Sequence, residues 1–199
     1  MRCLTALEQK EWLATNDQVE SPYSKSAISK GKFYRQFCAP PRLAQVEAFA
    51  SHFLDIWKSG EALLVVTDWP LYRPYEMKLI DLIRMAHGEK RSLIDAPGHL
   101  FSLNEKNDLI SFFGLSVAYY WSAYLYPPSA KVTLFNWEGE IFDYWTDDSE
   151  NYETLLSLQK SFRLKKTGML STKLYWMGKK ALWRFNRLIK CDGHRPPLQ

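Results

Sequence analysis

A short apolar run limits the fold of this chain most strongly. Residues 62–66 read Ala-Leu-Leu-Val-Val, and Thr67-Asp68-Trp69-Pro70 follow at once. The run is too short for an ordinary helix, it ends in β-branched residues, and a proline stops it. We therefore predict a strand that is buried on both faces, which other layers of the chain must cover.

The remaining segments divide between helix and strand patterns. Apolar residues recur every three or four positions in four segments, which predicts helices over residues 40–57, 75–87, 104–120 and 150–163, and a shorter helix is expected over 4–14. Strand patterns occupy residues 32–39, 91–94, 122–126, 131–137 and 140–145. A hairpin turn is expected at Glu138-Gly139, and another turn at residues 95–98.

These elements predict the fold class α+β. The chain has 199 residues, of which 46% are apolar, and this is enough for one well-cored domain. We expect a mixed or antiparallel sheet packed by four or five helices over residues 1–168. Residues 169–199 are predicted to form a basic amphipathic helical tail.

Charge is divided unevenly along the chain, whose formal net charge is +4. Residues 160–199 contain 11 Lys and Arg against one acid, whereas the other 159 residues contain 15 basic and 21 acidic side chains. Such asymmetry indicates a charged partner. The tail would fold back on the domain, lie on an anionic membrane, or bind nucleic acid. The tail residues of interest are Trp176, Lys179, Lys180, Trp183, Arg187 and Lys190.

An acidic and aromatic segment follows the predicted hairpin. Between Lys131 and Lys160 there are seven acids and no Lys or Arg, with Trp and Tyr among them. Such a surface could pack on a basic protein; the alternative is a solvated hairpin and helix start. The candidate partner-binding residues are Trp137, Glu138, Glu140, Asp143, Tyr144, Trp145, Asp147 and Asp148.

Catalytic and metal signals are weak. Asp68, Asp95 and His99 could supply a base and an orienting acid if the segments that carry them meet at one sheet edge. The alternative is that Asp68 caps a backbone donor and that His99 forms a hydrogen bond inside a tight turn. No metal-ligand spacing, phosphate-binding glycine loop or nucleophile motif accompanies them, so we expect neither metal nor cofactor.

One family resemblance covers residues 61–145. It is carried by the strand that ends in Trp69, by Gly88-Glu89, by residues 96–101 (Ala-Pro-Gly-His-Leu-Phe), and by Trp121 with the strand Ala-Tyr-Leu at 123–125. These residues resemble a family of small uncharacterised bacterial cytoplasmic proteins, which are similar to immunity proteins of toxin systems. The family pattern has Asp in place of Ser122 and Ser-His-Asp-Glu in place of residues 135–138.

The resemblance and the acidic segment together favour a non-enzymatic interaction protein. The first hypothesis is an immunity-type inhibitor that occludes a bacterial toxin or effector protein. The second is a nucleic-acid or membrane-surface adaptor that acts through the basic tail, and the third is a hydrolase using Asp68, Asp95 and His99. No apolar leader or run of about 20 apolar residues is present, and we expect a cytoplasmic location.

Overall fold

The computed structural model describes residues 1–21, 33–68, 74–128 and 131–167, and up to residue 166 these belong to one compact unit, Met1–Lys166. Its strands are β1 (Arg2–Leu4), β2 (Phe33–Cys38), β3 (Glu61–Asp68), β4 (Gly98–Ser102), β5 (Ser122–Tyr126), β6 (Val132–Trp137) and β7 (Ile141–Thr146). Its helices are α1 (Ala6–Thr15), α3 (Leu43–Phe53), α4 (Pro74–Ala86), α5 (Lys106–Ala118) and α6 (Ser149–Ser161), with short 3-10 turns at Leu54–Ile56 and Leu103–Glu105.

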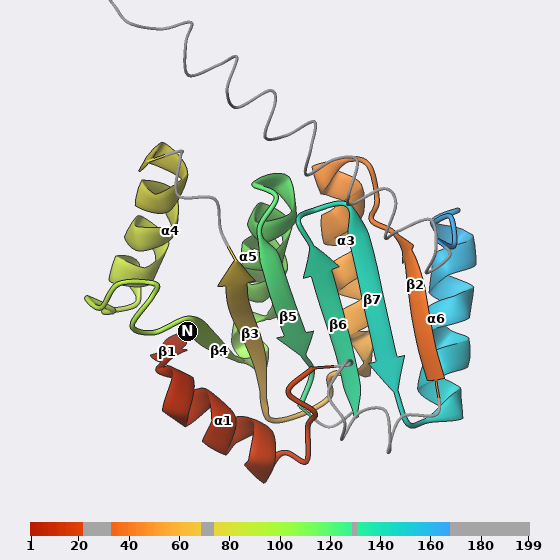
Figure 1. Ribbon diagram of the computed structural model, residues 1–199, viewed down its shortest axis with the longest axis horizontal. Coiled ribbons are helices and arrows are strands. Elements are labelled where there is room, and N and C mark those ends of the chain that lie inside the picture. Colours follow the sequence, from red (N-terminus) through yellow and green to blue (C-terminus); the bar gives the residue numbers. More distant parts are fainter. Residues whose placement is uncertain (22–32, 69–73, 129–130, 168–199) are drawn as a thin grey trace, which may run out of the picture. The chain divides into compact units, whose positions relative to one another are not determined.

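The seven strands form one antiparallel sheet in the order β1-β4-β3-β5-β6-β7-β2 (Figure 1). This confirms the predicted α+β class and makes the sheet antiparallel. The meander β5-β6-β7 matches the predicted strands and hairpin. The basic helix predicted over 169–199 lies outside the described residues.

Strand β3 occupies a central place and is covered on both faces, as its apolar run predicted. Leu64 and Val66 belong to the main core, which α3, α5 and α6 cover, whereas Leu63 and Val65 face the other side. There a smaller core includes Leu13 of α1. A sheet with both faces covered requires apolar residues at successive strand positions, which explains the unbroken run.

The hairpin between β6 and β7 has the turn geometry that its sequence indicates. Glu138 and Gly139 both have positive φ, at 43° and 74°, which matches the right-handed twist of the flanking strands. A Cβ atom on Gly139 would lie 2.2 Å from the carbonyl oxygen of Val117. The end of α5 therefore packs directly on this turn, and only glycine fits there.

The strand predicted at residues 91–94 is absent, and the predicted turn lies earlier than expected, at residues 93–95. Gly98, expected in this turn, begins β4. Gly98 pairs with Leu4 on one side and with Val65 on the other, and a Cβ on it would lie 3.0 Å from the Leu4 Cβ. Strand β1 comes from the start of the chain, so the local pattern around Pro97-Gly98 could not reveal this pairing.

Candidate anion-binding groove

A shallow groove lies where the end of α6 meets β2. Helix α6 ends in a left-handed residue, Arg163, with φ of 54°. The amide of Arg163 donates to the Lys160 carbonyl at 3.0 Å, and the amide of Leu164 donates to the Gln159 carbonyl at 2.9 Å. This pair of bonds is the Schellman pattern, which satisfies the last carbonyls of a helix and turns the chain away.

After this turn the chain runs beside β2. The amide of Cys38 donates to the Lys165 carbonyl at 2.9 Å, and Phe37 forms an isolated bridge with Lys166. Two consecutive lysines are thereby fixed next to a strand that stands at the end of the sheet order. Residues from the end of α6, from this return segment and from β2 then share one surface.

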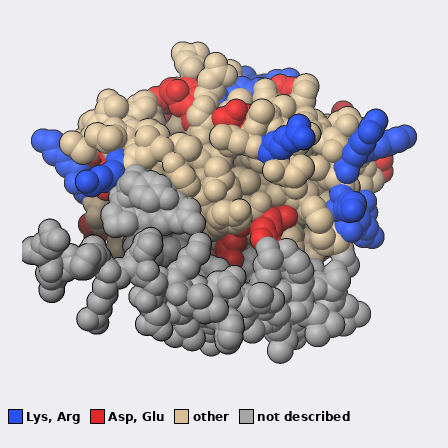
Figure 2. Space-filling view, turned by 90° about the horizontal axis from the view of Figure 1, so that it is seen from above, with Lys and Arg blue, Asp and Glu red and all other residues tan. Residues whose placement is uncertain are grey.

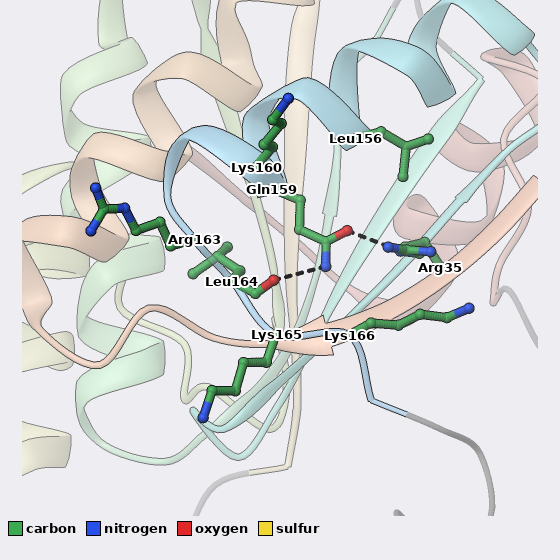
Figure 3. A pocket seen from close by; sticks show the side chains of 8 residues that line it. All are labelled: Arg35, Leu156, Gln159, Lys160, Arg163, Leu164, Lys165 and Lys166. Atoms are coloured by element: carbon green, nitrogen blue, oxygen red, sulfur yellow. Dashed lines mark hydrogen bonds between the residues drawn. The ribbon is translucent and has the colours of Figure 1, made fainter.

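We call this surface the basic groove, and Figure 3 shows the side chains that line it. Its volume is about 460 Å³, and its lining contains five cations and no carboxylate. Four of the cations are exposed, and Arg35 is half-buried. The lining residues are Arg35, Leu156, Gln159, Lys160, Arg163, Leu164, Lys165 and Lys166.

One hydrogen-bonded chain organises the floor of the groove. Arg35 donates from Nε to the Gln159 side-chain oxygen at 2.9 Å, and Gln159 donates from Nε2 to the Leu164 carbonyl at 3.0 Å. Gln159 is only 5% exposed, so its side chain is fixed by burial as well as by both bonds. The Arg35 side chain therefore has a defined orientation at the centre of the groove.

Among the described residues, the cations of the groove have no acidic partner. Two lysines outside the groove do pair with acids, Lys131 with Asp17 at 2.7 Å and Lys106 with Asp55 at 3.0 Å, whereas the other lysines of the described chain form no ion pair. No ion pair joins a groove cation to an acid within the residues that the structure describes. The dipole of α6 favours Lys160 and Arg163 near its C-terminus, but this effect does not account for the three cations from other segments.

Figure 2 shows Lys and Arg side chains along its right-hand edge, on the side where Figure 1 places α6 and β2. Figure 2 also shows Lys and Arg side chains at its left edge and top, so the case for the groove depends on its lining of five cations without a carboxylate. A single carboxylate or phosphate in the groove could bond to Arg35 from the floor while the surrounding cations add longer-range attraction.

Three of the eight predicted partner-binding residues are buried, so they do not form part of an outward surface. The Asp143 carboxylate is fully buried and accepts hydrogen bonds from Tyr34 Oη at 2.6 Å, from Gln36 Nε2 at 2.9 Å, and from Trp137 Nε1. Tyr144 lies in the main core, where burial raises its pKa above the ordinary value. Trp145 packs with Val19 on the opposite face.

The remaining acids of the hairpin are separated in space. Glu138 and Glu140 flank the turn that precedes β7, whereas Asp147 and Asp148 follow the end of β7. A strand of six residues places these two ends roughly 20 Å apart. Asp148 also caps α6 by accepting from the Glu150 amide at 3.0 Å, so the expected single acidic and aromatic surface does not exist.

The three candidate catalytic residues do not converge. His99 is fully buried in β4 opposite Leu64, and Asp68 lies four residues further along β3, which is about 13 Å of strand. Asp95 is exposed and accepts from Ser92 Oγ at 2.6 Å. The expected hydrogen bond of His99 in a turn is also wrong, because His99 is in a strand.

Burial changes the titration of this histidine and of its cross-strand neighbour. It lowers the pKa of His99 to about 3, with the nearby Arg84 charge as the second cause, and neither ring nitrogen bonds to a group in the described part of the chain. Burial also raises the pKa of the Cys3 thiol, which pairs with His99 in register. A fully buried imidazole of such low basicity is a poor general base, and a protonated thiol is a poor nucleophile.

The groove is only partly visible in the sequence. Lys160, Arg163, Lys165 and Lys166 contribute to the basic composition after residue 160, but nothing local indicates that Arg35 joins them. Gln159 carries no recognisable signal, since its role depends on a partner 124 positions away. The six tail residues from Trp176 to Lys190 named above lie outside the described residues.

No known relative, metal cluster or membrane-spanning helix adds to the description of the groove in the part of the chain that the structure describes. Comparison of the chain with protein-family models, with curated proteins and with solved structures gave no match, so the family resemblance stays a prediction. Among the residues described, no cluster of three or more His, Cys, Asp or Glu could hold a metal ion. No helix within the described ranges has both the length and the apolar character to cross a bilayer.

Proposed function

We propose that this protein acts by binding a nucleic acid, whose phosphate backbone contacts the basic groove. One observation carries the proposal. Five cations, from β2, from α6 and from the segment after it, line one surface that has no carboxylate in its lining. Contacts between Lys or Arg and phosphates supply essentially all of the affinity of proteins that bind nucleic acids without reading sequence.

The arrangement of the cations supports a polyanion with several separate charges. In Figure 3 Arg35 points toward Gln159, while Lys160, Arg163, Lys165 and Lys166 extend from the centre in different directions. A small anion could reach only some of these ends at once. A chain of phosphates that crosses the groove could contact them in succession.

The position of exposed apolar residues favours nucleic acid over a membrane surface. Peripheral membrane binding combines basic and apolar side chains on one face. Here Leu82 and Met85, each 62% exposed, lie on α4, and Ile94, 68% exposed, follows that helix. Figure 1 shows α4 at the opposite end of the sheet from α6 and β2, so the two kinds of side chain are separated.

The basic composition after residue 160 fits the same function. The groove cations Lys160, Arg163, Lys165 and Lys166 belong to a region with 11 Lys and Arg against one acid. The hypothesis that the tail residues around Trp176 and Trp183 bind the same polyanion remains a proposal. It would extend the contact beyond the groove.

A charge-reversal experiment tests this function. The variant Arg163→Glu/Lys165→Glu/Lys166→Glu should bind fluorescein-labelled single-stranded DNA at least tenfold more weakly in fluorescence anisotropy. The dependence of log affinity on log salt should become shallower by about 2, because single strands contribute about 0.7 per phosphate contact. The matched control Lys10→Glu/Lys58→Glu/Lys78→Glu changes three exposed lysines that do not line the groove and should bind nearly as well as the unaltered protein.

The outcomes separate the partner classes. Equal binding by both triple variants would contradict the proposal. Binding of phosphatidylserine-containing vesicles but not of DNA, with loss in the groove variant, would instead assign the groove to a membrane surface.

An immunity-type inhibitor is a second proposal, now restricted to the acids at the start of α6. Asp148, Glu150 and Glu153 are exposed there, and Asp147 is partly exposed. Reversal of Asp147 and Asp148 to Lys should weaken a stoichiometric complex with a basic toxin, measured by calorimetry after a pull-down from the native cell. Unchanged affinity would remove this proposal.

A further inference from the structure

The five cations of the groove differ in how firmly they are held. Lys160, Arg163, Lys165 and Lys166 are exposed, and none of their side chains makes a hydrogen bond to a described residue. Arg35 is half-buried, and its Nε donates to the buried Gln159. Only Arg35 therefore meets a ligand with its side chain already ordered.

The hydrogen bond from Arg35 Nε to Gln159 leaves the two terminal nitrogens of Arg35 available to a ligand. The guanidinium carries five N–H donors, of which Nε uses one on Gln159. Within the described ranges neither Nη1 nor Nη2 of Arg35 bonds to another group. Two parallel donors of this kind match two oxygens of one phosphate, and prior ordering reduces the entropy lost on binding.

We propose that Arg35 is the residue that anchors the ligand in the groove and that it binds one phosphate group through Nη1 and Nη2. This proposal rests on the nucleic-acid function proposed above. Gln159 is a positioning residue, because it touches Arg35 and the Leu164 carbonyl but need not touch the ligand. The four exposed cations contribute charge without fixed geometry.

The first test uses Arg35→Lys, which keeps the positive charge but removes the paired donors. Its affinity for the single-stranded DNA probe should fall about tenfold, because a lysine cannot form the paired charge-assisted hydrogen bonds to a phosphate, while the salt dependence stays unchanged. The comparison variant Lys166→Ala should lose only a fewfold in affinity, and its salt dependence should become shallower by about 0.7. Arg35→Lys with unaltered affinity would overturn the proposal.

The second test uses Gln159→Met, which keeps the approximate size of the side chain and removes both hydrogen bonds. Affinity should fall severalfold with unchanged salt dependence, because no charge is lost. Gln159→Glu adds a carboxylate beside Arg35 and should weaken binding further. Gln45→Met, the same substitution at an exposed position outside the groove lining, is the control and should bind normally. Thermal unfolding of each variant establishes that it is folded.

Failure of the two proposals can be distinguished. If reversal of Arg163, Lys165 and Lys166 leaves DNA binding intact, the nucleic-acid function itself is wrong. If that reversal weakens binding while Arg35→Lys and Gln159→Met bind as the unaltered protein does, the function stands and the role of Arg35 is wrong. Should Gln159→Met fail to fold, the salt dependence and affinity of Arg35→Lys still decide.

Discussion

Two arginines at opposite ends of the sheet show how one residue type serves different purposes. Arg84 of α4 is 1% exposed, and its Nη2 donates to the carbonyls of Ser92 and Ala96 at 3.2 and 3.0 Å. It joins the helix to the segment that leads into β4. No carboxylate within the described chain pairs with it, and its Nε and Nη1 have no partner there.

Arg35 of β2 has the opposite arrangement. Its Nε is held by Gln159, and its terminal nitrogens face a groove that is open to solvent. A buried charge must be compensated inside the protein, whereas an ordered charge at the surface can be compensated by a ligand. Both arginines are anchored by hydrogen bonds, so anchoring does not distinguish their roles. The difference is that the terminal nitrogens of Arg84 are buried, which suits a structural role, whereas those of Arg35 can meet a ligand.

The largest effect is expected from Arg84→Ala, because it removes a buried side chain and leaves two carbonyls without their donor. We expect the free energy of unfolding to fall by about 4 kcal/mol. Urea denaturation followed by circular dichroism measures this. Leu82→Ala on the exposed face of the same helix is the control and should change stability by less than about 0.5 kcal/mol. A similarly small loss of stability for Arg84→Ala would contradict the structural role of Arg84.

Asp143→Ala tests the same principle with the opposite charge. Its carboxylate accepts from Tyr34, Gln36 and Trp137, so truncation leaves three donors without this acceptor. We expect a loss of about 3 kcal/mol in the free energy of unfolding, by the same measurement. Asp143→Asn keeps one acceptor oxygen and should lose less. Equal stability of all three proteins would show that the network contributes nothing.

The buried His99, which lies near Arg84, predicts that the stability of the protein depends on pH. Burial lowers the pKa of His99 to about 3 from an ordinary value of 6.5, so below pH 6.5 the unfolded chain takes up a proton that the folded protein refuses. Stability contributed by the neutral form is therefore lost as pH falls. From about pH 7 to about pH 5 the loss should be about 2 kcal/mol.

His99→Leu removes this proton uptake and should be less sensitive over the same interval, as chemical denaturation at each pH would show. The other charged groups that act on His99 are Arg84 and Glu89. The pKa of Glu89 is held at about 2 chiefly by its hydrogen bond with Arg91, so Glu89 does not titrate in this interval. An identical pH dependence in the variant would contradict the expected role of His99.

The smallest effect on stability is expected from Arg35→Ala. Its loss in the free energy of unfolding should stay near ~1 kcal/mol, because truncation leaves one buried acceptor, the Gln159 side-chain oxygen, without its donor. Its affinity for single-stranded DNA should nevertheless fall more than tenfold in fluorescence anisotropy. Thus Arg84→Ala should change stability most and Arg35→Ala binding most. If Arg35→Ala instead changed stability most and Arg84→Ala changed binding most, the roles assigned to the two arginines would be wrong.

The local elements and the burial of β3 could be predicted from the amino-acid pattern alone. The apolar run at 62–66, the helical repeats of α3, α5 and α6, and the glycine turn at Gly139 are all patterns within a few residues. Such patterns report which faces of an element are apolar, because side-chain direction repeats with the period of the helix or strand. They consequently predicted the fold class and most of the strands.

The contacts between residues that are distant in the chain became visible only in the folded protein. The pairing of Gly98 with Leu4, the burial of Asp143 beneath Tyr34, and the bond from Arg35 to Gln159 each join positions more than 90 residues apart. No local period carries this information, since each contact depends on the order of strands in the sheet and on where α6 ends. For that reason the acidic hairpin looked like an exposed surface in the sequence, and the basic groove was visible only as an excess of charge.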